Sequence, residues 1–76
     1  MSAYKIVTRV TEIAQDLWHV SASASMAATP RQGLITREHE CASREQAIDF
    51  LEILVDQVRV AVEATGGDVV GVTSAD

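Results

Sequence analysis

The first third of the chain alternates between apolar and polar positions, the pattern of a β-strand with one buried face. Residues 4–13 and 17–26 both alternate, and both are rich in β-branched or aromatic side chains. Residues 14–16 interrupt the pattern and form a plausible short turn. The two segments are therefore predicted to form a β-hairpin.

The register of this hairpin follows from the apolar pattern, because a shift by one residue would turn Trp18 and Val20 toward water. Pairing Glu12 with Trp18 collects nearly all of the large apolar side chains on one face. The remaining predicted pairs are Val10 with Val20, Thr8 with Ala22, Ile6 with Ala24 and Tyr4 with Met26. The opposite face is mostly small or polar and carries Lys5, Val7, Arg9, Thr11, Leu17, His19, Ser21, Ser23 and Ser25.

Two further strands are predicted after the hairpin. Residues 27–33 contain Pro30 and Gly33 and predict a loop. Residues 34–41 form a third strand whose charges are typical of a sheet edge. Residues 68–73 form a short last strand, which either joins the first strand in parallel or pairs with a second copy of the chain.

Between these strands, residues 44–65 are predicted to form one long helix. Ser43 is followed three residues later by Gln46, which makes a capping box, and Gly66-Gly67 ends the helix. The helix would be about 33 Å long at ~1.5 Å per residue, enough to cover the hairpin. Its expected buried face comprises Ile48, Leu51, Leu54, Val55, Val58, Ala61 and Val62.

The predicted fold class is α+β. We expect residues 1–76 to form a single domain in which an antiparallel β-meander of three strands packs on one long helix, followed by a short C-terminal strand (β-β-β-α-β).

The surface of the helix carries a narrow acidic stripe opposite the apolar face. Its members are Glu45, Asp49, Glu52, Asp56, Arg59 and Glu63, of which only Arg59 is basic. Such a stripe is usually a solvated face that keeps a protein in solution. The alternative is a surface that docks on a basic partner, for which carboxylates on a rigid rod are suited.

Three large apolar residues of the helix, Phe50, Ile53 and Val60, lie between the acidic stripe and the apolar face. They are either the margin of a wide core face or a second apolar contact, such as a partner groove or a dimer interface.

Composition narrows the class of protein. The single cysteine, Cys41, excludes an intrachain disulfide, and no segment has the length of a membrane span. Together with an N-terminus that lacks the apolar core of a signal peptide, this predicts a cytoplasmic protein with no membrane contact. Residues 1–37 carry four basic and two acidic side chains, whereas residues 38–68 carry eight acidic and two basic ones.

The residues that could carry chemistry are few. His19 shares a strand face with three serines, but residues two apart on a strand are ~6.5–7 Å apart, too far for a nucleophile and its base. His39 and Cys41 share a face of the third strand, and His19 could approach them, yet the spacing matches no metal motif. Gly66–Gly71 follows a helix and is not a phosphate loop. We therefore predict no enzyme activity, metal or cofactor.

A weak basic patch is predicted on the open face of the sheet. Its members would be Lys5, Arg9, His19, Arg37 and His39. Readers of single-stranded RNA use such faces with stacking aromatic side chains, but this chain has one Phe, one Tyr and one Trp and a net charge of −5. Both features argue against direct nucleic-acid binding.

The predicted order β-β-β-α-β places Asp16-Leu17-Trp18-His19-Val20 on a strand and Ser43-Arg44-Glu45-Gln46-Ala47 at the start of the helix. With these segments, residues 4–65 resemble the N-terminal domain of HicB-type antitoxins. The Gly-Cys pair that commonly precedes the helix in that family is absent. In its size, acidity and low cysteine content, the chain also looks like phage-encoded inhibitors, including anti-CRISPR proteins and DNA mimics.

These patterns lead to one functional prediction and two alternatives. We predict a non-enzymatic inhibitor or adaptor that occludes a basic site on a partner protein. The partner-binding residues would be Glu45, Asp49, Glu52, Asp56 and Glu63, with Phe50, Ile53 and Val60 as apolar anchors. The first alternative is a HicB-like regulatory homodimer that binds through the open sheet face or the strand edges. The second is an enzyme or small-ligand binder that uses His19, His39 or Cys41.

Overall fold

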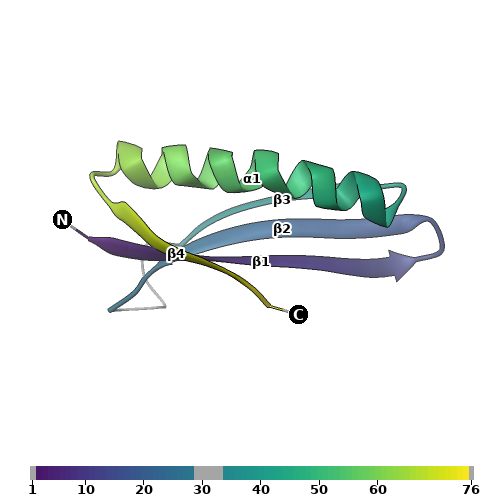
Figure 1. Cartoon of the computed structure of the whole chain (residues 1–76), viewed down its shortest axis with the longest axis horizontal. Helices are drawn as coiled ribbons and strands as arrows, with labels where there is room; N and C mark the ends of the chain where they lie inside the picture. Colours follow the sequence, from purple (N-terminus) through teal and green to yellow (C-terminus); the bar gives the residue numbers. More distant parts are fainter. Residues whose placement is uncertain (1, 29–33, 76) are drawn as a thin grey trace.

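The protein is a two-layer α+β structure in which one helix lies along one face of a four-stranded sheet (Figure 1). The computed structural model describes residues 2–28 and 34–75; the predicted loop residues Pro30 and Gly33 lie outside this part. The elements are β1 (Ala3–Ala14), β2 (Leu17–Met26), β3 (Ile35–Cys41), α1 (Arg44–Ala64) and β4 (Asp68–Ser74). The predicted fold class and element order are confirmed.

The predicted register of the β1–β2 hairpin is also confirmed, from Tyr4 opposite Met26 to Glu12 opposite Trp18. The register shifts beyond Glu12, so that Ala14 pairs with Leu17. Asp16 in the turn has a φ of 58°, in the left-handed region that Asp tolerates better than most residues because its short side chain can bond locally.

The sheet is mixed, because β4 joins the edge of β1 in parallel while β1, β2 and β3 are antiparallel neighbours. The strand order is β3-β2-β1-β4, so β3 occupies an edge as predicted. Parallel strands need a long crossover connection, and α1 provides it by returning the chain from the β3 edge to the β4 edge. Of the two arrangements predicted for the last strand, the structure shows the intrachain one.

Both ends of α1 are capped by the residues that the sequence indicates. Ser43 Oγ accepts a hydrogen bond from the backbone N–H of Gln46 at 3.2 Å, and Gln46 Oε1 accepts one from the N–H of Ala42 at 3.2 Å. At the other end, Gly67 N–H donates to Val62 C=O at 3.1 Å, and Gly66 adopts a φ of 84°. These are the bonds and the left-handed glycine of a Schellman motif.

The core lies between α1 and the inner face of the sheet. The fully buried residues of α1 are Ala47, Leu54, Val58 and Val62, and they pack over residues that include Ile6, Val20, Ala22 and Ala24 of the hairpin. Ile48, predicted to be buried, is instead 42% exposed. It lies about 100° around the helix from Ala47, at the margin of the buried line.

Replacing Leu54 with Ala is expected to lower the free energy of unfolding by about 2–5 kcal/mol, because the cavity sits under a fully packed helix. Ile53→Ala is the matched control, since its half-exposed side chain loses fewer contacts and should cost clearly less. Equilibrium urea unfolding measures both. Equal losses for the two variants would contradict the described orientation of α1.

Gly67 has no room for a side chain, because an added Cβ would meet the Tyr4 ring at 2.5 Å and Val62 Cγ1 at 3.1 Å. The Gly67→Ala variant should therefore lose about 1–3 kcal/mol of stability through overpacking. Gly71→Ala, with no atom within 4 Å of the added Cβ, is the control. Thermal unfolding followed by circular dichroism would show a lower Tm for Gly67→Ala alone.

Candidate functional site

The five carboxylates of the acidic stripe, Glu45, Asp49, Glu52, Asp56 and Glu63, are all exposed on α1. They cover about 27 Å of helix at ~1.5 Å per residue. In the part of the chain that the structure describes, the only ion pair joins His19 to Glu38, so none of the five carboxylates is neutralised by an ion pair. Arg59, which is also exposed, is the one basic member of the stripe and reduces the repulsion between them.

Two of the three predicted apolar anchors stand beside this acidic stripe. Val60 is 65% exposed and Ile53 is 48% exposed, which is high for large aliphatic side chains on one helix. Phe50 differs, because it is half-buried against the core. Its ring stacks on His39 of β3 with the centroids 4.0 Å apart and the planes 16° from parallel. Phe50 therefore forms part of the floor of this surface, while Ile53 and Val60 project from it.

Two adjoining grooves run along the side of α1 that faces β3. One has a volume of about 420 Å³ and is lined by Arg37, Ile53, Asp56, Gln57 and Val60. The other has a volume of about 370 Å³ and is lined by His39, Glu40, Cys41, Ala42, Gln46, Asp49, Phe50 and Ile53. Ile53 belongs to both grooves, so the two lie next to each other, with Asp49 and Asp56 lining them on the helix side.

The sequence pattern did not predict that side chains of β3 would line these grooves. Arg37 pairs with Ala22 and His39 with Val20, so both point to the helix side of the sheet. The predicted basic patch on the open face is therefore wrong for these two residues. The alternation along β3 places Arg37 and His39 on the same face as Ile35 and Cys41. Only these last two of its seven residues are apolar, so the sequence pattern does not show which face of the strand is buried.

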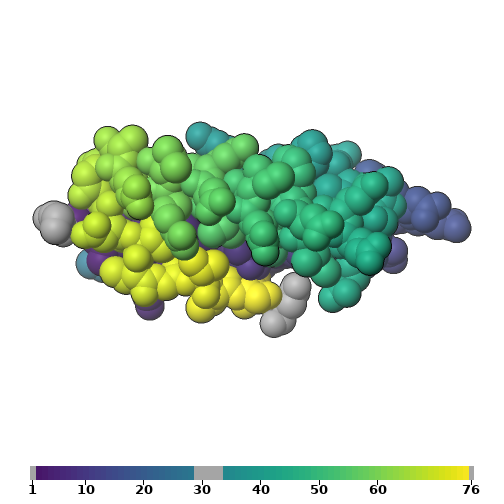
Figure 2. Space-filling view, turned by 45° about the horizontal axis from the view of Figure 1, so that its top comes forward, coloured from purple at the N-terminus to yellow at the C-terminus, as the bar shows by residue number. Residues whose placement is uncertain are grey.

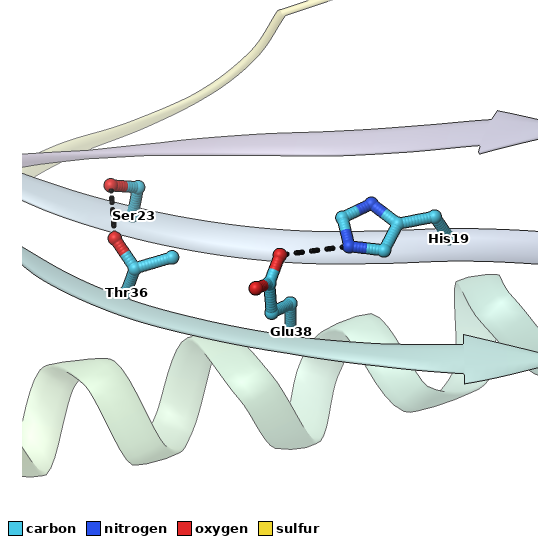
Figure 3. Close-up of polar contacts among 4 residues, drawn as sticks. All are labelled: His19, Ser23, Thr36 and Glu38. Atoms are coloured by element: carbon cyan, nitrogen blue, oxygen red, sulfur yellow. Dashed lines mark hydrogen bonds and ion pairs between the residues drawn. The ribbon is translucent and has the colours of Figure 1, made fainter.

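The same pairing separates the residues considered for metal binding. His19 is opposite Glu40 and faces away from the helix, whereas His39 and Cys41 face toward it. Among the described residues, no group of three His, Cys, Asp or Glu side chains is close enough to hold a metal ion. On the open face, His19 Nε2 lies 2.8 Å from Glu38 Oε2, and Ser23 Oγ lies 3.0 Å from Thr36 Oγ1 (Figure 3).

A third groove lies on the other side of α1, facing β4, with a volume of about 340 Å³. Its lining residues are Thr8, Leu51, Glu52, Val55, Asp56, Arg59 and Val72. Figure 2 shows a strip of β1 (purple) between α1 and β4 (yellow). This groove could not be predicted from the sequence, because it exists only when β4 lies beside β1.

Comparison with protein-family models, with curated proteins and with solved structures finds no match to this chain. In residues 2–28 and 34–75, no helix is long and apolar enough to cross a membrane.

Proposed function

We propose that this protein is a non-enzymatic protein-binding module that occludes a basic site on a partner protein through α1. The observation that carries the proposal is the exposed acidic stripe, whose five carboxylates form no ion pair within the described structure. An acidic row of this kind raises the association rate with a basic surface and disfavours acidic partners.

The charge of the stripe is held on a rigid support. Both ends of α1 are capped, and its buried line anchors it to the sheet along its length. The spacing of the carboxylates is therefore set before binding, so little conformational entropy would be lost on association. This rigidity favours an inhibitor or adaptor that presents a preformed surface.

The grooves on the β3 side would add apolar contacts with the partner to the electrostatic attraction of the acidic stripe. Ile53 lines both grooves and Val60 lines one of them, both side chains are exposed, and Asp49 and Asp56 lie beside them. Interfaces commonly combine such an apolar centre with a charged periphery. A partner with basic side chains around an apolar or aromatic projection would match this arrangement.

The double charge reversal Glu52→Lys and Asp56→Lys tests the stripe. The matched control is Glu12→Lys with Asp68→Lys, which changes the net charge equally but lies off the helix. Partners would be captured quantitatively from cells of the encoding organism with wild type, stripe variant and control. We expect a protein that wild type and control retain and the stripe variant loses, with affinity at least about tenfold lower and a shallower salt dependence.

Capture of the same proteins in equal amounts by all three forms would contradict the stripe as the binding surface. Circular dichroism of each variant excludes unfolding as the cause of a loss, since all four substituted residues are exposed.

The apolar anchors are tested separately with Ile53→Ala and Val60→Ala. Because both side chains project into solvent, the double variant should stay folded with a Tm close to that of wild type. Its affinity for the captured partner should nevertheless fall by about five- to tenfold, the loss of roughly 1 kcal/mol typical of a contributing interface residue. Isothermal titration calorimetry would measure this affinity. An unchanged Kd would show that Ile53 and Val60 do not contribute to binding.

A further inference from the structure

The face of the sheet opposite α1 is not covered by any described element of the chain. It is formed by the outward-pointing residues of the strands, which include Arg9 and Thr11 of β1, His19 and Ser21 of β2, and Glu38 and Glu40 of β3. Figure 1 shows α1 on one side of the sheet only. Ser21, Ser23 and Ser25 of β2 have small side chains, so another surface could approach this part of the β2 backbone closely.

Opposite charges are separated across this open face. The β1 side carries Lys5 and Arg9, whereas the β3 side carries Glu38 and Glu40. Lys5, Arg9 and Glu40 form no ion pair within the described residues, and Glu38 contacts only His19. The face thus has a basic half and an acidic half with the serines of β2 between them.

The register makes this charge pattern self-complementary. Arg9 and Glu38 are both pairing partners of Ser21, so they lie at the same height on opposite sides of β2. A two-fold axis that runs parallel to β2 under Ser21 would place Arg9 of one copy over Glu38 of the other, twice by symmetry. Thr11 and Glu40 are likewise both partners of His19, so the same axis brings the Thr11 hydroxyl to the Glu40 carboxylate.

We propose that the open sheet face binds a second copy of this chain, face to face, in this orientation. Two sheets packed in this way keep their strands roughly aligned. A two-fold axis perpendicular to the strands would instead superpose β1 on β1 and β3 on β3, and like charges would oppose each other. The charges therefore select one of the two symmetric arrangements.

This partner fits the face better than one of uniform charge. A nucleic acid would be attracted by the β1 half and repelled by the β3 half, and a basic peptide would meet the reverse. A partner surface that also has a basic half and an acidic half can attract both halves of this face. A second copy of the chain has this charge pattern because its sequence is identical. The resulting dimer places α1 on both outer layers, so it would present two acidic stripes pointing in opposite directions.

Sedimentation velocity over a concentration range tests the proposal. Because the face is small and polar, wild type should associate weakly, with dimers at about 0.5 mM that dissociate on dilution and with added salt. Arg9→Glu and Glu38→Arg should each weaken dimerisation at least about tenfold, since each replaces attraction by repulsion at two symmetric sites. The combined variant restores both pairs with reversed polarity and should dimerise again.

A mixture of the two single variants gives the sharpest result. Neither variant should associate with itself, but together they should form a heterodimer, because each supplies the charge that the other has lost. Arg59→Glu and Glu63→Arg are the controls. They change the net charge identically but lie on exposed positions of α1, away from the sheet face, and should dimerise like wild type.

A wild type that stays monomeric up to about 1 mM would overturn the proposal. So would a dimer that Arg9→Glu leaves intact, or one that both α1 controls disrupt as strongly as the sheet variants. None of these measurements involves the partner of the acidic stripe, so their outcome is independent of the proposed function.

Discussion

The structure depends on the packing of one helix line against small residues in the middle of a sheet. Leu54, Val58 and Val62 of α1 belong to one buried cluster with Ala22 and Ala24 of β2, which are completely buried. Because the alanines occupy little volume, the helix approaches the sheet closely and its apolar line is removed from water. A chain of 76 residues can bury little further apolar surface, so its stability is concentrated in this one layer.

The rest of the helix surface follows from this packing. With the line from Ala47 to Val62 buried, the acidic stripe must point away from the sheet, since the two are on opposite sides of α1. α1 lies over β2 and β3 more than over β1 and β4, and it is narrower than the four strands beneath it. Apolar residues on both flanks therefore stay partly exposed and line the grooves.

The two sides of the molecule have different electrostatic character. The helix side presents a predominantly acidic surface along α1, which suits a basic partner. The open sheet side divides its charges between β1 and β3, which suits a surface divided in the same way. Both properties reflect one sequence asymmetry: four of the six basic residues lie in residues 1–37, whereas eight of the eleven acidic residues lie in residues 38–68.

The sequence by itself determined the elements with strong local signals. The alternation of β1 and β2 identified the hairpin and its register, because only one register buries Trp18 and Val20 together. Ser43 and Gly66 marked the ends of α1, and the 3.6-residue period placed its carboxylates on one exposed stripe. The tertiary structure alone decided that β4 joins β1, that Arg37 and His39 face the helix, and that Phe50 stacks on His39. These features depend on contacts between residues distant in the chain. A short strand with an irregular pattern, such as β3 or β4, carries too little periodicity to reveal them, so its neighbours determine its position.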